Sequence, residues 1–297
     1  MEWHVWDFSD NIMVCLDSKC RELLYEKLIE VCKTRIEIAR RLKSNKETIR
    51  RSLCLGHRNN RIAYISMKLI KNIIKNFGEQ LGNEFLESLE KNIVFYRSWN
   101  GWNVKNPVLP IKESPMFYSV VFHLIGDGNA SVRHSPFYSN KCEELLNEFK
   151  NNLQFFGDVE TKTIIREDGV VKVYFPKAIS DILSYVLKIN FTRPQNLPER
   201  IFQASNECKI AAIRAFIDDE GSISSSFCIA QKSSNVLRQL KKILESLNIK
   251  SGKVCIEKDI HKIYISKYSY KKFVSSINLT HPKKHGNLIN KVKERGM

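Results

Sequence analysis

The stretch VVFHLIGDG occupies residues 120–128, and a second stretch of the same form, IRAFIDDEG, occupies residues 213–221. Each stretch is an apolar run with helical character that ends in an acidic residue followed by glycine. The two acidic residues, Asp127 and Glu220, lie 93 positions apart. A repeat of this length predicts two similar halves within one folded unit.

The chemistry of this repeated motif follows from the properties of helix ends. Apolar residues along both runs would let two helices pack on each other, and each glycine is expected to leave its helix in a left-handed conformation. A carboxylate at a helix C-terminus is unfavourable, because that end already carries partial negative charge. A divalent cation would relieve the repulsion between two such carboxylates. The pair therefore indicates metal-assisted phosphodiester cleavage, and its matching contexts argue against two ordinary helix-end turns.

Composition narrows the class of protein. The chain has 297 residues, of which 43% are hydrophobic, and a formal net charge of +16. This charge favours a polyanionic partner, most simply nucleic acid. The eight cysteines form no Cys-x-x-Cys pair, which argues against a zinc site and favours reduced thiols in the cytoplasm. With no signal segment and no apolar run near the ~20 residues of a membrane helix, we expect no membrane partner.

Much of the positive charge lies in one short segment. Residues 33–75 contain 13 Lys or Arg against two acidic residues, Glu37 and Glu47, a net of +11. A solvated helix face usually mixes charges of both signs. The segment is therefore a candidate surface for nucleic acid.

The same segment predicts a helix-turn-helix. TRIE at residues 34–37 has the form of a capping box, and SNKE at 44–47 offers a second helix start. Ala39 suits a close approach of two helices, whereas Lys43 stands in the turn where this motif often has glycine. The candidates for contacts in the DNA major groove are Asn45, Lys46, Thr48, Arg50 and Arg51. The alternative is a small helical domain with a basic surface.

The order of expected elements divides the chain into two domains. Residues 1–105 are expected to form a helical domain and a linker, since the proline-containing stretch 97–115 lacks periodicity. Residues 106–297 are expected to form an α+β domain. Its first repeat covers about 115–195 and its second about 205–280, each with helices, strands and a hairpin in the same order.

With both motifs and both repeats in view, residues 107–290 resemble the LAGLIDADG homing endonucleases in their two-repeat, single-chain form. NPVLP at residues 106–110 and LPERIF at 197–202 add to the resemblance. It implies an αββαββα unit in each half, motif helices packed at the centre, and two sheets that form a saddle on DNA. One departure is Phe122, which replaces the usual glycine of the helix contact, where the second half has Ala215.

The resemblance also implies roles for single residues. Asp127 and Glu220 match the acidic position of the motif and would hold Mg²⁺ or another divalent cation against the scissile phosphates. Gln231 matches a position that orders water near the metals in some members, and Asn140 is a looser match. Lys284 resembles a basic residue that supports the transition-state charge, although its neighbour Lys283 is an alternative. For Gln231 and Lys284 an ordinary surface contact is the competing interpretation.

The hairpin strands are expected to supply further contacts to DNA, because alternate residues of a strand face the same side. In the second repeat, Val254, Ile256, Ile263 and Ile265 should face the core, and Glu257 should face outward. The candidates for the DNA-facing side are Thr161, Thr163, Lys172, Lys253, Lys262 and Tyr264.

These features predict a monomeric, site-specific, metal-dependent endonuclease that cleaves double-stranded DNA. One alternative is a DNA-binding regulator that does not cleave, and another is a maturase that binds structured RNA during intron splicing. The carboxylate pair favours the endonuclease over the regulator, since a non-cleaving protein gains nothing from two buried like charges. No sequence feature excludes the maturase.

Overall fold

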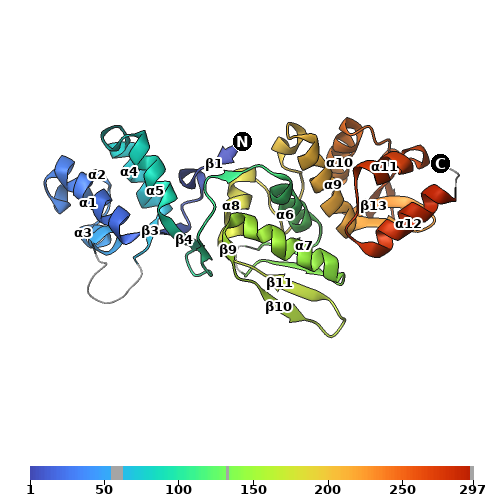
Figure 1. Cartoon of the computed structure of the whole chain (residues 1–297), viewed down its shortest axis with the longest axis horizontal. Helices are drawn as coiled ribbons and strands as arrows, with labels where there is room; N and C mark the ends of the chain where they lie inside the picture. Colours follow the sequence, from blue (N-terminus) through green and yellow to red (C-terminus); the bar gives the residue numbers. More distant parts are fainter. Residues whose placement is uncertain (55–62, 132–133, 295–297) are drawn as a thin grey trace. The chain divides into compact units, whose positions relative to one another are not determined.

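The computed structural model describes residues 1–54, 63–131 and 134–294. The chain folds into two compact units, and Figure 1 labels many of their elements. Unit 1 comprises residues 1–112, 156–160 and 176–186, and unit 2 comprises residues 113–155, 161–175 and 187–297. This division differs from the expected boundary after residue 105, because two later segments return to unit 1.

Unit 1 combines the expected helices with a five-stranded sheet that the sequence analysis did not predict. Its helices are α1 (Ser18–Cys32), α2 (Arg35–Arg41), α3 (Lys46–Ile49), α4 (Met67–Leu81), α5 (Asn83–Lys91) and, except for its last residue, α8 (Lys177–Leu187). Its strands are β1 (Glu2–Trp3), β2 (Ile12–Leu16), β3 (Ile65–Ser66), β4 (Ile93–Ser98), β5 (Val104–Lys105), β6 (Ile111–Lys112) and β9 (Asp158–Val159). The sheet has the order β3-β2-β4-β5-β9, and β1 pairs with β6.

The stretch 97–115, expected to be a linker, is largely part of unit 1. Strand β5 pairs with both β4 and the returning strand β9, and the Asn106 side-chain amide donates a hydrogen bond of 2.6 Å to Asp158. The periodicity of the sequence could not reveal this, because two-residue strands are too short to show a pattern.

Unit 2 contains two repeats with the same sheet topology, which confirms the predicted α+β class. The first repeat has α6 (Pro115–Gly126), β7 (Gly128–Asn129), β8 (Phe137–Asn140), α7 (Glu143–Leu153), β10 (Lys162–Ile165) and β11 (Val171–Tyr174). The second has α9 (Asn206–Glu220), β12 (Gly221–Ile223), β13 (Phe227–Gln231), α10 (Ser234–Ser246), β14 (Cys255–Glu257), β15 (Ile260–Tyr264) and α11 (Tyr270–Ser276), and α12 (Pro282–Lys293) follows. The sheets run β10-β11-β8-β7 and β12-β13-β15-β14, so corresponding strands occupy corresponding places.

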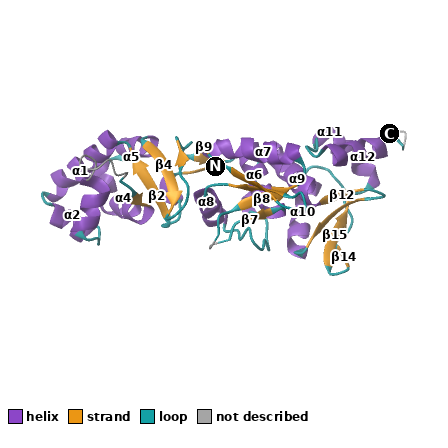
Figure 2. Ribbon diagram, turned by 90° about the horizontal axis from the view of Figure 1, so that it is seen from below, coloured by secondary structure: helices purple, strands orange, loops and turns teal. Residues whose placement is uncertain are grey.

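The motif helices α6 and α9 pack on each other at the centre of unit 2. Figure 2 shows α6 and α7 along one face of the sheet that contains β8. Every residue of α6 from Phe117 to Ile125 is buried. The rings of Phe122 and Phe216 meet edge to face, with centroids 6.4 Å apart. An aromatic pair therefore accommodates Phe122 in the helix contact, whereas the matching position of the second repeat holds the small Ala215.

The two motif glycines are required for close approach rather than for a left-handed backbone, so that expectation is wrong. Gly221 has φ −78°, and Gly128 is also outside the positive-φ region. A Cβ on Gly128 would lie 2.5 Å from the Cα of Leu124, and one on Gly221 would lie 2.5 Å from the carbonyl oxygen of Ile217. Each strand after the motif thus begins against the last turn of its own helix.

Gly82 and Pro282 mark two helix ends of the chain. Helix α4 continues through Gly78 and ends before Gly82, which has φ +79°. Helix α12 begins at Pro282, because proline is well suited to the first turn of a helix. Within the described part of the chain, none of the helices is long and apolar enough to span a membrane.

Candidate active site

Asp127 and Glu220 lie at the C-terminal ends of the packed helices α6 and α9. Asp127 is the residue that caps α6, and Glu220 is the last residue of α9. Burial, with a contribution from Asp219, raises the pKa of Asp127 to about 7. Burial, with contributions from Asp127 and Asp219, raises the pKa of Glu220 to about 8. Burial and the neighbouring carboxylates therefore disfavour ionisation of both Asp127 and Glu220.

A side-chain amide supports each acidic residue in the same way. Asn140, at the end of β8, donates from Nδ2 to Asp127 Oδ2 over 3.2 Å, while its Oδ1 accepts from the next two backbone N–H groups at 2.8 and 3.0 Å. Gln231, at the end of β13, donates from Nε2 to Glu220 Oε1 over 3.3 Å, and its Oε1 accepts from the next N–H at 2.7 Å. The repeats thus place two acid–amide pairs in equivalent positions.

Lys284, rather than Lys283, lies beside the acidic residues. Its ammonium donates to the carbonyl oxygens of residues 217, 218 and 219 at 3.2, 2.5 and 3.1 Å, which caps the end of α9. Burial lowers the pKa of Lys284 below its ordinary value, although the surrounding carboxylates oppose this shift. All three of its N–H bonds are directed at the protein, so a direct contact of Lys284 with phosphate stays a prediction.

Asp218 and Asp219 were not among the residues selected from the sequence, although they stand next to Glu220. Asp218 accepts hydrogen bonds from the backbone N–H groups of Thr280 and His281 at 3.0 and 3.1 Å, which anchors the start of α12. Burial raises the pKa of Asp218 to about 6. The sequence signal that could have identified Asp218 and Asp219 is the run of three acidic residues in the second motif, since the first motif has only Asp127.

The side chain of Asp219 is fully buried and bonded on both oxygens. Its Oδ2 lies 2.9 Å from Nδ1 of His123, and its Oδ1 accepts from the hydroxyl of Tyr138 at 2.6 Å and from the amide of Asn140 at 3.2 Å. Burial lowers the pKa of His123, but the carboxylates of Asp219, Glu148 and Asp218 together outweigh this effect and raise it above the ordinary value. Because both of its oxygens already accept hydrogen bonds within the protein, Asp219 is a structural neighbour of the site.

The donor set of the site fits a hard divalent cation. Each of Asp127 and Glu220 receives one side-chain hydrogen bond, from Asn140 and Gln231, which leaves further carboxylate lone pairs. No group of three or more His, Cys, Asp or Glu within the described ranges is arranged to hold a metal ion. A cation held by two carboxylates would complete its shell with water and phosphate oxygens, as Mg²⁺ commonly does.

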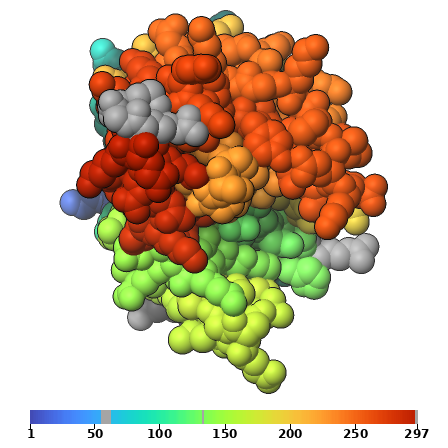
Figure 3. All heavy atoms as spheres, turned by 90° about the vertical axis from the view of Figure 1, so that its right-hand side faces the viewer, coloured from blue at the N-terminus to red at the C-terminus, as the bar shows by residue number. Residues whose placement is uncertain are grey.

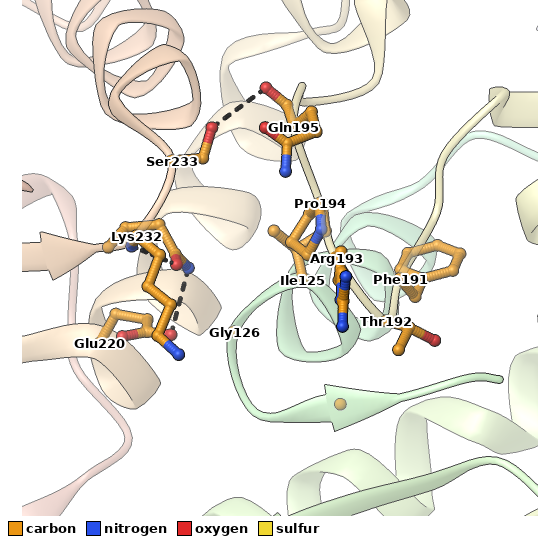
Figure 4. Close-up of a pocket in the computed structure, with 12 residues that line it drawn as sticks. Ile125, Gly126, Phe191, Thr192, Arg193, Pro194, Gln195, Glu220, Lys232 and Ser233 are labelled. Atoms are coloured by element: carbon orange, nitrogen blue, oxygen red, sulfur yellow. Dashed lines mark hydrogen bonds between the residues drawn. The ribbon is translucent and has the colours of Figure 1, made fainter. Parts of the chain in front are cut away.

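A cavity of about 470 Å³ opens beside Glu220 (Figure 4). Its walls are formed by the end of α6, the segment between the repeats, and the β13–α10 connection. The lining residues are Ile125, Gly126, Gly128, Phe191, Thr192, Arg193, Pro194, Gln195, Glu220, Gln231, Lys232 and Ser233. Arg193 and Lys232 bring positive charge next to the acidic end of α9. Sequence reasoning missed them because exposed Lys and Arg are common in this chain.

Residues 207–278 match the family described as the LAGLIDADG-like domain. No curated protein matches the chain. The match of residues 207–278 agrees with the family predicted from the paired motifs, and it lies in the second repeat of unit 2.

Several solved structures resemble part of the chain at low identity. A structure of mesophilic variants of the homing endonuclease I-DmoI has 17% identity, covers 55% of this chain and 94% of that chain, and has a TM-score of 0.41. The homing endonuclease I-WcaI bound to its DNA recognition sequence has 12% identity, coverages of 60% and 87%, and a TM-score of 0.44. Full-length DUF199/WhiA from Thermatoga maritima has 15% identity, coverages of 62% and 61%, and a TM-score of 0.46.

The hairpins of the two repeats extend beyond the core of unit 2. Figure 3 shows the hairpin β10–β11, in yellow-green, projecting from the body of the unit. Ile256 on β14 is 63% exposed, so its expected place in the core is wrong, whereas Ile263 and Ile265 are buried as expected. Val254 is partly exposed. Alternation places Ile256 on the core side, but its strand runs past the edge of the core.

The strand register separates the candidate DNA contacts of the second repeat from the core. Lys262 and Tyr264 lie on the side opposite buried Ile263, and both bond Glu257 across the hairpin, at 2.7 and 2.6 Å. Lys253 precedes β14 and is exposed. The outward orientation of this set is confirmed, and contact with DNA stays a prediction.

In the first repeat the expected grouping is wrong. Thr163 pairs with Val173, which is buried, whereas Lys172 pairs with Ile164 and Ser139. Cross-strand partners share a face, so Thr163, and by alternation Thr161, lie on the core side and Lys172 on the open side. Every residue of β10 is exposed, so alternation alone could not assign its faces.

The basic segment of unit 1 contains two helices joined by a tight turn, α2 and α3. Lys43 in this turn has φ +49°, which is the conformation that glycine favours. Asn45 caps α3 by accepting from the N–H of Thr48 at 2.6 Å, so its carbonyl oxygen is already used. Helix α3 is short and is followed by a π-helical turn, η2 (Arg50–Cys54). The predicted second helix is therefore shorter and less regular than expected.

Glutamates hold the arginines of this segment. Glu37 bonds Arg40 and Arg41, and Glu47 bonds Arg50 and Arg51, at distances of 2.6–2.8 Å. The Glu37 side chain is thus turned away from the expected capping box, in which only Thr34 takes part. Lys46 and Arg51 are exposed at the start and end of the predicted recognition segment.

Proposed function

We propose that this LAGLIDADG-domain chain is a site-specific, metal-dependent endonuclease that cleaves double-stranded DNA as a monomer. The observation that carries the proposal is the equivalent placement of two acid–amide pairs, Asp127 with Asn140 and Glu220 with Gln231, at the ends of packed helices. One chain supplies both pairs, and each strand of a duplex requires one cleavage.

Each group of the site has a role in this reaction. Asp127 and Glu220 would hold divalent cations, Mg²⁺ or a similar ion, which supply Lewis-acid activation at the scissile phosphates. Asn140 and Gln231 orient the carboxylates, because the opposite end of each amide is fixed by backbone N–H groups. Lys284 contributes positive charge near the site while it caps α9.

The basic segment of unit 1 is proposed to bind DNA and thereby to lengthen the contacted site. The excess of Lys and Arg between residues 33 and 75 supports this part of the proposal. Lys46 and Arg51 are its most accessible candidate contacts, whereas Asn45 would act as a helix cap. In unit 2 the candidate contacts are Lys172, Lys253, Lys262 and Tyr264.

The test is selection of cleaved sites from a random DNA library in the presence of Mg²⁺, with chelator as the negative control. Cleavage by the wild type that is abolished by Asp127→Asn and by Glu220→Gln, with DNA binding retained, is the expected result. Binding should survive because it depends on many phosphate contacts, whereas the chemistry depends on the carboxylates. Glu245→Gln is a matched control, since this glutamate is exposed on α10.

Two outcomes would replace the proposal. Specific DNA binding by the wild type without cleavage under any divalent cation would favour a regulator. A preference for structured RNA over duplex DNA in a competition assay would favour a maturase.

A further inference from the structure

A buried polar network crosses the interface between the motif helices α6 and α9. Asp219 on α9 meets His123 on α6, and neither side chain has exposed surface. The hydroxyl of Tyr138 and the amide of Asn140 complete the bonds of Asp219. Nε2 of His123 has no hydrogen-bond partner in the described structure, so the polar role of this ring is its contact with Asp219.

The second repeat has no equivalent of this network. Asp219 directly precedes the acidic residue of its motif, and the matching position of the first motif is Gly126. His123 lies four positions before Asp127, and the matching position of the second motif is Phe216. Tyr138 pairs with the first motif glycine, whereas Ile229 pairs with the second.

Apolar residues pack the matching positions of the second repeat, so packing alone does not call for a polar network at this place. Phe216 and Ile229 fill the matching positions of the second repeat and are fully buried. A buried ionic pair is often no more stabilising than apolar residues of similar volume, because both charges lose water. The presence of the network in the first repeat alone indicates that it has a role in the half-site of that repeat.

Asn140 connects the network to the candidate active site. Its Nδ2 lies 3.2 Å from Asp127 Oδ2 and 3.2 Å from Asp219 Oδ1, so one amide group bridges the two carboxylates. In the second repeat, Gln231 has a longer side chain and its Nε2 meets Glu220 alone among the bonds of the described residues. The first half-site is therefore held by more contacts than the second.

We propose that Asp219, held by His123, is a positioning residue that orients Asn140 and through it Asp127, and so makes the two half-sites unequal. The inference rests on the proposed endonuclease function. Each cleavage adds one water across a P–O bond, and no further reactant is required. The strand that is cleaved at the half-site of Asp127 and Asn140 is cut first. Loss of Asp219 removes this difference in cleavage rate between the two strands.

The first experiment uses the full chain without metal or DNA. In ¹⁵N-labelled protein, the side-chain amide signals of Asn140 and Gln231 are followed in Asp219→Asn and Gly126→Ala. A Cβ at Gly126 would lie 2.9 Å from both Cβ and Oδ2 of Asp219, so it displaces this carboxylate without removing a polar group. Gly286→Ala is the control, since a Cβ there meets no atom within 4 Å.

The expected result is a large change of the Asn140 amide signal and little change of the Gln231 signal in both variants, with the control unchanged. An unchanged Asn140 signal, or equal changes of both amides, overturns the positioning role. Thermal melting shows that each variant is folded, and Gly126→Ala provides a second probe if Asp219→Asn is unstable.

The second experiment measures cleavage of each strand of an end-labelled duplex that carries the selected site, with Mg²⁺. Wild type should cut one strand first. Asp219→Asn should slow that strand by about 10-fold to 100-fold, as loss of an outer contact typically does, and the other strand by about 2-fold or less. Equal slowing of both strands overturns the proposal. If the wild type cuts neither strand, the proposed function fails, while the amide signals still decide the role of Asp219.

Discussion

Asp127 and Glu220 combine two unfavourable placements, since each is partly buried and each stands at the negative end of a helix. Their raised pKa values are the expected consequence. Without a cation, the folded protein holds these groups in their neutral form over a wider pH range than the unfolded chain does. The site therefore stores electrostatic strain that a divalent cation would relieve.

Replacement of these carboxyl groups should stabilise the metal-free protein at high pH. A carboxyl group with a raised folded pKa contributes most stability below its unfolded pKa, and this contribution is lost as pH rises through the folded values of about 7 and 8. Asp127→Asn and Glu220→Gln should therefore raise Tm at pH 8.5 in chelator by roughly 3 °C or more, and less at pH 5. Scanning calorimetry measures this, and Glu245→Gln should show no gain. An equal gain at both pH values would contradict the assignment.

Cation binding should release protons. The ligating form of each carboxyl group is the deprotonated one, so apparent affinity for Mg²⁺ should rise between pH 6 and pH 8. Calorimetric titration in buffers of different ionisation enthalpy measures the released protons. Affinity that is independent of pH would argue against Asp127 and Glu220 as the ligands.

At the scale of single elements, the turn from each motif helix into its strand depends on glycine. Gly128→Ala and Gly221→Ala should each destabilise the protein by about 1–3 kcal/mol, because the added Cβ would lie 2.5 Å from backbone atoms. Urea unfolding monitored by circular dichroism measures the change. Gly286→Ala on α12 is the control and should fall within about 0.5 kcal/mol of wild type. Near-neutral effects at Gly128 and Gly221 would mean that these turns can shift.

In the basic segment, Glu37 and Glu47 form ion pairs with the neighbouring arginines. Two guanidinium groups lower the pKa of Glu47 to about 2, which shows how closely it is paired. Glu47→Gln should free Arg50 and Arg51 and increase the affinity for duplex DNA several-fold. Glu79→Gln removes the same charge from an exposed site on α4 and is the matched control. Anisotropy titrations at fixed salt compare the variants, and equal effects would indicate net charge alone.

At the scale of the whole molecule, the contribution of unit 1 to DNA binding can be tested by charge rather than by truncation. Removal of residues 1–105 would leave β9 without its partner β5, because unit 1 includes residues 156–160. The triple variant Lys46→Gln, Arg50→Gln and Arg51→Gln should instead reduce the slope of log K against log salt by up to about 3. Cleavage at saturating protein should persist. An unchanged slope would mean that the segment serves another partner, such as a protein.

The sequence by itself determined the features that repeat or that lie close together along the chain. The paired motifs predicted two like halves, and the sheets have the same strand order in both. The family resemblance carried by these motifs was enough to select Asn140 and Gln231, which lie just before the next helix of each half. Such features are local, since the spacing of apolar residues, turns and helix ends follows from neighbours within a few residues.

The tertiary structure decided what depends on residues far apart in the chain. His123 and Asp219 meet across 96 positions, and residues 156–160 and 176–186 return to unit 1. The register of β10 against β11 decided that Lys172, rather than Thr163, faces outward. The physical reason is that periodicity describes a single element, whereas contacts between elements depend on how their side chains pack and on which polar groups are left to bond one another once water is excluded.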